Sequence, residues 1–475
     1  MKKSSKINEN VTAAVAVIVL SAVFLSLVWN NNVWMDEAFT ASLVHTDMAG
    51  VLKRSMADTL PPLYNIILKL TTTAFGYTIP VMKITSVVPM ILTLVIGATT
   101  VRRRFGIRTA LLFMVFITCM PLMLYYGVEI RMYSLGFFFA TASGIYAYEV
   151  IAEPSRRTWT AFTLFSVMAG YSHHFAFVTV AFSYLFLLLY HIIVKREMIK
   201  SWFKCLAATF ILYLPCLIVT LKQFSRVSGY FSMPDVDAAM FVQYAVYPYT
   251  VGMKAATILC ALIMLAALVI CIYEMVTGKK RDVTAVYALW CFLTYYFVLL
   301  FGTAVCHIMS ANIFVDRYLF FATGLLWLFA SVMLGSKKSF IPALAAALAV
   351  GVCVYIVEYR VEYSNSADEE IAFLREHVNE GDVYYSIGGH EEMQNCIPFY
   401  TYVDKDCPEL EFVHPLEKAI RTSEERGTTL WISVLEGFEP TDEEALLLVD
   451  NGLSLVKMAD FDFDRYRCEF YIVKR

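Results

Sequence analysis

Long apolar segments recur along the first 360 residues of the chain, and short polar stretches that hold most of the charges separate them. The segments lie near 11–29, 80–101, 108–126, 132–151, 159–172, 175–194, 202–221, 253–276, 284–308, 315–335 and 340–358. Most of them approach the roughly 20 residues that a helix needs to cross the ~30 Å core of a bilayer. The pattern therefore predicts an all-α polytopic membrane protein with about eleven transmembrane helices.

The stretch 159–194 is too long for one helix, and the polar sequence YSHH at 171–174 interrupts it. We expect a helical hairpin whose polar tip reaches the membrane interface. Its first half, 159–172, is short for a membrane span.

A different pattern begins near residue 361. Short β-prone runs at 382–387, 429–434, 453–458 and 466–473 alternate with runs at 367–378 and 441–449 that suit helices. Strands that alternate with helices are typical of α/β domains, and about 110 residues are enough for a separate core. The sequence predicts a membrane domain over 1–360 and a soluble α/β domain over 361–475.

The composition agrees with a membrane protein. Hydrophobic residues make up 59% of the chain, charged residues make up 17%, and the mean hydropathy is +0.61. The chain has a net charge of -3, so it lacks the excess of basic residues that is typical of a nucleic-acid-binding protein. We therefore expect membrane lipids as partners and no nucleic acid.

Lysine and arginine cluster in alternate connections between the predicted spans. The clusters are Lys2, Lys3 and Lys6; Arg102–Arg104 with Arg108; Arg156 and Arg157; Lys195, Arg196, Lys200 and Lys204; Lys279–Arg281; and Lys337 and Lys338. Short loops rich in basic residues stay on the cytoplasmic side of a membrane. This predicts a multi-pass plasma-membrane protein with a cytoplasmic N-terminus, whereas the loop 30–79 and the α/β domain are extracytoplasmic.

The first outer loop, 30–79, carries more than a simple connection needs. It contains the adjacent acids Asp36 and Glu37, and Asp58 precedes a double proline. Its segments 47–57 and 63–74 have apolar residues at helical spacing, which suits helices that lie in the plane of the interface.

An alternative is that 62–79 forms one more span. The arginine cluster at 102–104 argues against this alternative, because one more crossing would place the cluster outside.

Ionisable and aromatic residues gather on the predicted outer side. They are Asp36, Glu37, Asp58, Tyr64, Glu129, Arg131, Tyr133, His173, His174, Arg317 and Tyr318. Singly they have plain explanations, such as a solvated acidic loop, an arginine at a lipid headgroup or a polar helix tip. Together they supply carboxylates that can take up a proton and arginines that can stabilise a phosphate leaving group.

An ordered set of motifs in this group resembles the membrane glycosyltransferases of the GT-C fold. The motifs are WMDEAF at 34–39, D-x-x-PPLY at 58–64, E-x-RMYSL at 129–135, HHF at 173–175 and DRYL at 316–319. The chain is most similar to the group that contains protein O-mannosyltransferases and aminoarabinose transferases, over roughly residues 10–335. Relatives often have a histidine or another polar residue before the double proline, where this chain has Leu60.

The resemblance implies transfer of a sugar, of hexosyl or mannosyl type, from a polyprenyl-phosphate donor to a glycan, lipid or protein acceptor outside the membrane. It implies that Asp36 is the general base, that Glu37 assists it, and that Arg131 and Arg317 hold the carrier phosphate. The other outer-side residues would bind substrate. Two adjacent acids are a thin ligand set for Mg²⁺ or Mn²⁺. Although phosphate oxygens could complete it, the resemblance to enzymes with monophosphate donors favours no metal and no other cofactor.

Two other classes of function stay open. A polar-lipid transporter or flippase would place charges near the midplane of its spans and show repeated halves, whereas here the charges lie mainly at span ends. A non-catalytic envelope assembly protein would use the α/β domain to hold a partner. Turnover of a lipid-linked sugar by purified protein separates an enzyme from both.

Cysteine usage adds little. Only Cys396, Cys407 and Cys468 lie in the predicted soluble domain. In an oxidising compartment Cys396 could pair with Cys407, although the odd number of cysteines there does not favour it.

Overall fold

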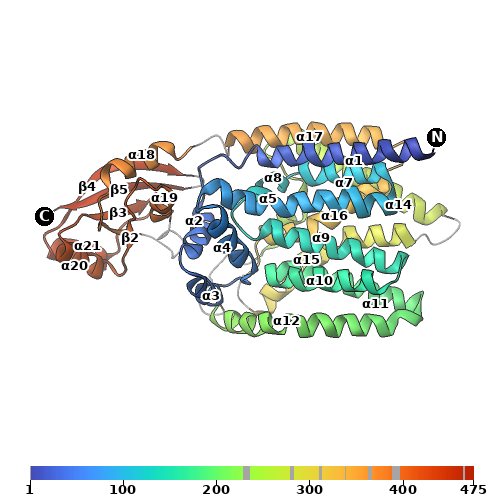
Figure 1. The fold of residues 1–475 in the computed structure, drawn as a ribbon, viewed down its shortest axis with the longest axis horizontal. Coiled ribbons are helices and arrows are strands. Elements are labelled where there is room, and N and C mark those ends of the chain that lie inside the picture. Colours follow the sequence, from blue (N-terminus) through green and yellow to red (C-terminus); the bar gives the residue numbers. More distant parts are fainter. Residues whose placement is uncertain are drawn as a thin grey trace. The chain divides into compact units, whose positions relative to one another are not determined.

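The computed structural model describes residues 2–227, 236–278, 283–309, 313–336, 338–361, 366–387, 396–463 and 466–474. The chain divides into two compact units (Figure 1). The helical unit comprises Met1–Leu27, Leu52–Tyr64 and Ile84–Glu358, and the mixed unit comprises Val28–Val51, Asn65–Lys83 and Tyr359–Arg475. The mixed unit therefore combines parts of the first outer loop with the C-terminal residues.

Within the described residues, nine helices are long and apolar enough to cross a membrane. They contain α1 (Lys2–Leu25), α5 (Ile79–Ile96), α9 (Tyr133–Ala152), α11 (His174–Ile193), α12 (Ile199–Val227), α14 (Lys254–Thr277), α15 (Val283–Met309), α16 (Phe320–Leu334) and α17 (Phe340–Val361). A π-helical turn (Gly97–Val101) and α6 (Arg102–Phe105) continue α5. These helices confirm a polytopic membrane protein.

One predicted span, 108–126, is shorter than expected. Helix α7 (Ile107–Cys119) ends early because Pro121 follows it, and Leu122 adopts a positive φ of 72° before the short helix α8 (Met123–Val128). Helix α10 (Arg156–Ser172) is the short first arm of the predicted hairpin. With the nine long helices, α7 and α10 account for all the apolar segments of the sequence.

The hairpin prediction at 171–174 is confirmed. Helix α10 ends at Ser172, His173 has an extended backbone, and α11 starts at His174. The imidazole Nδ1 of His173 accepts a hydrogen bond from the Phe175 N–H (3.1 Å) and so caps α11.

Helix α16 lies at the centre of the helical unit, and 83% of its most apolar 18-residue stretch is buried. It packs on α7, α9, α14 and α15. A Cβ atom added at Gly324 of α16 would lie 1.9 Å from Thr141 Oγ1 of α9, and one added at Gly136 of α9 would lie 2.6 Å from Phe321. These glycines let the two backbones approach closely, as small residues do between membrane helices.

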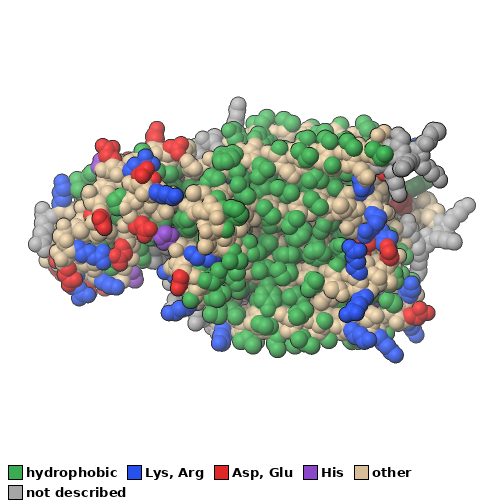
Figure 2. Space-filling view, in the orientation of Figure 1, with side chains coloured by type: hydrophobic (Ala, Val, Ile, Leu, Met, Phe, Trp, Pro, Cys, Tyr) green, Lys and Arg blue, Asp and Glu red, His purple; other side chains and the backbone are tan. Residues whose placement is uncertain are grey.

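The surface of the helical unit matches a lipid environment. Large apolar side chains such as Ile211, Val276 and Ile341 are exposed, and hydrophobic side chains cover the middle of the helices (Figure 2). Lysine and arginine gather at the end of the bundle that contains the N-terminus (Figure 2). A charged end beside an apolar belt is typical of a protein that spans a bilayer.

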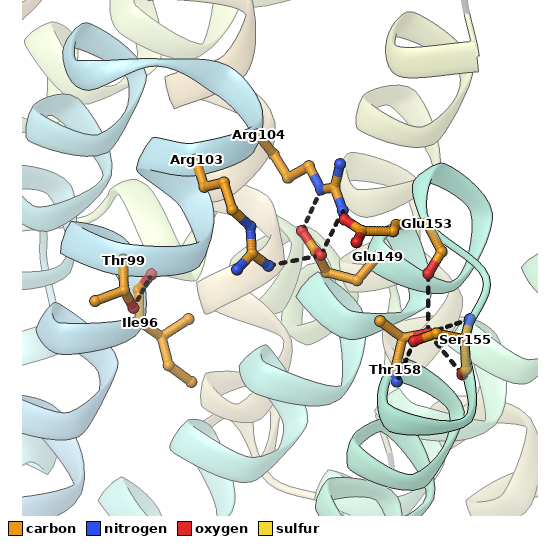
Figure 3. Close-up of polar contacts among 8 residues, drawn as sticks. All are labelled: Ile96, Thr99, Arg103, Arg104, Glu149, Glu153, Ser155 and Thr158. Carbon is orange, nitrogen blue, oxygen red and sulfur yellow. Dashed lines mark hydrogen bonds and ion pairs between the residues drawn. The ribbon is translucent and has the colours of Figure 1, made fainter.

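A buried ion cluster fixes that end of the bundle (Figure 3). Arg104 forms two bonds with Glu149 (Nε–Oε1 2.6 Å and Nη2–Oε2 2.8 Å), and Arg103 adds a third (Nη2–Oε2 2.7 Å). Arg104 also pairs with Glu153, whose backbone carbonyl accepts from Thr158 at the start of α10. The basic clusters at 102–104 and 156–157 therefore lie at the same end of the bundle, as the alternating charge pattern requires. The clusters at 279–281 and at Lys337 lie outside the described residues.

The C-terminal part of the mixed unit contains a five-stranded sheet in the order β2-β1-β3-β5-β4. The strands are β1 (Val383–Ile387), β2 (Glu411–Phe412), β3 (Leu430–Leu435), β4 (Ser454–Phe463) and β5 (Tyr466–Lys474). Strand β1 runs parallel to β2 and β3, and β5 runs antiparallel to β3 and β4. The predicted small α/β fold is confirmed.

Helices α18 (Asp368–His377) and α21 (Asp442–Asp450) match the two predicted helices of this part. Strand β2 and two helices, α19 (Cys396–Val403) and α20 (Leu416–Arg426), were not predicted. The structure describes all the cysteines of the chain and shows each of them as a free thiol, so Cys396 and Cys407 do not pair.

The first outer loop folds into α2 (Met35–Val44), α3 (Met48–Ala57) and α4 (Leu63–Phe75). Helices α3 and α4 confirm the two expected helices, whereas α2 was not predicted. Helix α4 has 13 residues, too few to cross a bilayer, so the alternative of a further span at 62–79 is wrong. A remaining short helix is α13 (Ala238–Val246).

Candidate functional site

The acidic pair, Asp36 and Glu37, lies in the first turn of α2 in the mixed unit. Their side chains are 3% and 4% exposed, so the plain explanation of a solvated acidic loop is wrong. Glu37 Oε2 accepts a hydrogen bond from the Trp34 N–H (3.1 Å), which satisfies a backbone donor just before the helix. Acids in a first helical turn are also favoured by the helix dipole.

The C-terminal part of the mixed unit holds α2 at both ends. Before the helix, the Val33 N–H donates to Tyr400 Oη (3.1 Å), and Asn31 donates to Asp368 Oδ1 (2.7 Å). After the helix, His45 stacks on Tyr402 with ring centroids 4.4 Å apart and planes at 6°. The helix that carries the acidic pair is thus supported by α18 and α19, elements far away in the sequence.

Further contacts surround His45. Its Nε2 lies 3.3 Å from Glu409 Oε1, and its ring meets Tyr77 edge-on at 4.9 Å. Tyr77 in turn donates to the backbone carbonyl of Ala41 in α2 (2.8 Å). Burial, with Tyr402 and Glu409 nearby, raises the pKa of Tyr77 well above its usual value, so its hydroxyl stays protonated and can donate.

Replacing Tyr402 with alanine should loosen α2 without unfolding the sheet. Because a stacked ring pair contributes about 1 kcal/mol, we expect amide hydrogen exchange in α2 to accelerate roughly fivefold. Hydrogen–deuterium exchange mass spectrometry measures this directly. Tyr471→Ala, which changes a tyrosine of β5 bonded to Glu469, is the control and should leave α2 unchanged. Equal exchange in both variants would contradict the support of α2 by Tyr402.

Lys83 is a buried charge that the sequence analysis missed. Its side chain is 1% exposed, and Nζ donates to the carbonyls of Asn30 (2.8 Å) and Asn32 (3.0 Å), just before α2. The residue was hidden within an apolar run. A lysine inside a predicted span indicates a functional role or a buried partner. On that ground Lys83 could have been recognised from the sequence.

A second group of predicted residues lies in the helical unit, in the turn from α8 to α9. Glu129, Arg131 and Tyr133 are 2%, 9% and 0% exposed. Glu129 ends α8, and its carbonyl accepts from the Arg131 N–H (2.6 Å). Tyr133 packs against Tyr126, whose hydroxyl lies 2.6 Å from that of Tyr247. The carboxylate of Glu129 and the guanidinium of Arg131 are therefore largely buried, in a turn that also contains buried tyrosines.

His173 lies in one region with four other predicted residues of the helical unit. Its ring lies 4.7 Å from that of Tyr318, in the 3₁₀ turn Asp316–Leu319. Burial first, then His174, Arg131 and Arg317, lower the pKa of His173 well below its usual value. The arginine pair, Arg131 and Arg317, therefore acts on the same imidazole, and that imidazole is neutral.

The hydrogen bonds of His173 also fix its tautomer. Because Nδ1 accepts from the Phe175 N–H, the neutral ring carries its proton on Nε2. Nε2 is buried, and no residue in the described part of the chain accepts a hydrogen bond from it. His173 can therefore donate one hydrogen bond to a bound group.

Asp58, Tyr64 and His174 organise the nearby turn. Asp58 Oδ1 accepts from the Thr59 N–H (2.6 Å), Tyr64 Oη lies 2.6 Å from Ser86 Oγ, and His174 Nε2 lies 3.2 Å from the Thr59 carbonyl. Two of these residues thus shape the Asp58–Leu60 turn and one anchors α4. His174 also lines a cavity beside this turn.

A cavity of about 490 Å³ opens beside this turn in the helical unit. Its lining is mainly apolar and includes Leu60, Phe175, Phe177, Val178, Leu217, Phe301, Val305 and Ile313. The polar residues that line it are Thr59, His173, His174, Tyr213, Thr220, Gln223 and Tyr318. The walls come from α11, α12, α15 and the Asp58–Leu60 turn. A mainly apolar cavity with a few polar groups suits an amphiphile.

The described residues hold no group of three or more His, Cys, Asp or Glu side chains that could bind a metal ion.

Comparison with known proteins identifies a structural relative. No protein-family model and no curated protein sequence matches the chain. Among solved structures, ArnT from Cupriavidus metallidurans in the apo state superposes with a TM-score of 0.65 at 11% identity, covering 99% of this chain and 98% of ArnT. The same ArnT bound to undecaprenyl phosphate gives 0.62 at 13% identity, covering 97% of each chain. The chain therefore has the GT-C fold of the ArnT glycosyltransferase, as the resemblance of its motifs predicted.

Proposed function

We propose that this membrane protein transfers a sugar from a polyprenyl-phosphate donor to an acceptor hydroxyl at the outer face of the membrane. The cavity beside His173 carries the proposal, because it offers an apolar lining for an isoprenoid and the imidazole of His173, whose pKa Arg131 and Arg317 help to lower. ArnT, whose fold the chain shares, has been solved with undecaprenyl phosphate bound. That likeness supports a lipid carrier of the same class.

The chemistry follows from the side chains. The acceptor oxygen forms a bond to the anomeric carbon of the sugar while its proton passes to the Asp36 carboxylate. The bond from the anomeric carbon to the phosphate oxygen breaks, and the phosphate of the carrier leaves with the electron pair. Attack from the opposite side gives inversion. Glu37, which caps α2, holds the backbone around the base.

Negative charge develops on the leaving phosphate. Hydrogen-bond donors that are already in position can stabilise this charge. Arg131 and Arg317 offer guanidinium groups that can hold phosphate oxygens in a bidentate manner. His173 adds a neutral N–H donor that does not release its proton. We assign the carrier phosphate to these three residues.

Loss of the protein tests the proposed function in cells. Cell-envelope glycans from cells with and without the gene should differ by one sugar modification, and mass spectrometry would identify both sugar and acceptor. Purified protein given the lipid-linked sugar should release free polyprenyl phosphate only when the acceptor is present. An unchanged envelope and no turnover of any lipid-linked sugar would favour a transporter or an assembly protein.

Arg131→Ala and Arg317→Ala should each weaken binding of undecaprenyl phosphate about 10–100-fold, because each removes a charge-assisted hydrogen-bond donor worth about 1.5–3 kcal/mol. Arg→Lys should recover only part of the loss, since lysine keeps the charge but not the fork. Native mass spectrometry of the detergent-solubilised protein measures the bound fraction.

Arg54→Ala is the matched control for this experiment. Arg54 is an exposed arginine of α3, in the same helical unit, and does not line the cavity. Its replacement should leave binding unchanged. If both Arg131→Ala and Arg317→Ala bind undecaprenyl phosphate as well as the parent protein does, the phosphate is held elsewhere.

A further inference from the structure

A groove lies between α10 and α12, and none of its lining residues lines the cavity at His173. It has a volume of about 630 Å³ and is lined by Pro154, Ser155, Arg156, Trp159, Thr160, Thr163, Leu164, Met198, Ser201, Lys204, Cys205, Ala208 and Leu212. Helix α11 returns between α10 and α12 in the chain, so the two helices start at the same end of the bundle and pack side by side. Their first turns therefore form one end of the groove.

The groove changes character along its length. Arg156 and Ser201 lie near the helix starts, whereas Leu164 and Leu212 lie eight or more residues further on, about 12 Å deeper at 1.5 Å per residue. The polar end lies where lysine and arginine gather (Figure 2), and the apolar end faces the belt of exposed hydrophobic side chains. Such a gradient matches one molecule with a charged head and an apolar tail.

The cations at the polar end are available for a ligand. Across the described residues, neither Arg156 nor Lys204 forms an ion pair or a side-chain hydrogen bond. The acids of this region do not line the groove: Glu153 pairs with Arg104, and Glu197 lies in the 3₁₀ turn before α12. The hydroxyls of Ser155, Thr160 and Ser201 add neutral hydrogen-bonding groups.

Trp159 joins the two ends of the groove. Its ring is half-buried, and its indole Nε1 is buried without a hydrogen-bond partner among the described residues. Tryptophan is enriched where a membrane protein crosses from headgroups to acyl chains, because one part of the ring is polar and the rest is apolar. The boundary between the polar end and the apolar end of the groove therefore lies close to Trp159.

We propose that this groove binds one anionic phospholipid, with its phosphate between Arg156 and Lys204 and an acyl chain along Leu164, Ala208 and Leu212. The two cations select a net negative headgroup, and the apolar floor selects a lipid over a soluble anion. The site is separate from the proposed transferase chemistry and does not depend on it.

Native mass spectrometry with added phosphatidylglycerol tests the site. Replacing both cations, in Arg156→Gln/Lys204→Gln, should weaken phosphatidylglycerol binding roughly tenfold, since each basic residue near an anionic headgroup contributes to the attraction. The matched control is Arg157→Gln/Lys200→Gln, which removes the same charge from neighbouring exposed positions outside the groove and should bind as the parent does. Equal losses in the two double variants, or no loss in the first, would overturn the proposal.

Two further arms define the ligand. Ala208→Phe fills the apolar floor and keeps both cations, so it should also weaken phosphatidylglycerol binding, whereas zwitterionic phosphatidylcholine should bind weakly to every variant. Inorganic phosphate should not displace the lipid at equal concentration. Displacement by phosphate, or full binding in Ala208→Phe, would show that the groove takes a free anion and not a lipid.

Discussion

Asp36→Asn should insert in the membrane, fold and bind undecaprenyl phosphate, yet transfer sugar 10²–10⁴-fold more slowly, roughly the range for a lost general base. The amide has nearly the same shape as the carboxylate, which matters because the Asp36 side chain is buried. It cannot take up a proton at neutral pH. Single-turnover transfer from a lipid-linked sugar, measured beside binding of undecaprenyl phosphate, separates chemistry from binding.

Asp47→Asn is the matched control. Asp47 lies in the same loop, and its Oδ1 accepts from the Gly50 N–H (2.8 Å) at the start of α3. Asparagine is as good as aspartate at such a helix cap, so this variant should transfer at the parent rate. Near-parent turnover by Asp36→Asn would show that another residue is the general base, with Asp58 and Glu129 as the next candidates.

Glu37→Gln should have a smaller effect than Asp36→Asn. The glutamine oxygen can still accept from the Trp34 N–H, so α2 keeps the bond that Glu37 makes before its first turn. A loss as large as that of Asp36→Asn would show that Glu37 shares the proton.

Arg104→Met should lower the free energy of unfolding by about 3 kcal/mol, because it removes two of the three bonds to a carboxylate that is 1% exposed. Arg103 remains, but its side chain is 58% exposed and makes a single bond to Glu149. We expect the thermal unfolding temperature in detergent to fall by several degrees.

The double variant Arg104→Met/Glu149→Met should recover most of the lost stability. Apolar residues of similar volume often replace a buried ion pair without net cost. Arg108→Met, on α7 near the same end, is the control and should leave the unfolding temperature unchanged. A double variant less stable than Arg104→Met alone would mean that the cluster contributes more than the burial of one unpaired charge.

The membrane helices could be predicted from the sequence because hydrocarbon imposes one requirement on every span, a long apolar run with internal backbone bonds. The prediction of the spans failed where local chemistry interrupts a run. Pro121 and Leu122 end α7 early. In the α/β part, α20 was missed although Leu416, Ala419, Ile420 and Ser423 are buried at helical spacing.

The candidate site was only partly predictable. Motif order selected the acidic pair, the arginine pair and His173 as candidates, but it gave no sign that α2 exists or that Tyr400 and Tyr402 support it. Those contacts join residues more than 350 positions apart, and no local pattern encodes them. Lys83 was missed for a different reason. One charged residue changes the mean hydropathy of a long apolar segment very little.

The long separation between α2 and its support sets an order of events during synthesis. The Val33–Tyr400 hydrogen bond spans 367 residues. At about 5–20 residues per second, a ribosome needs roughly 20–70 s to make that stretch, so the acidic pair leaves the ribosome long before α19 exists. During this interval the nascent chain has membrane helices but an unsupported α2. A chain that stops before residue 396 would therefore insert in the membrane but lack the Tyr400 and Tyr402 contacts that support α2.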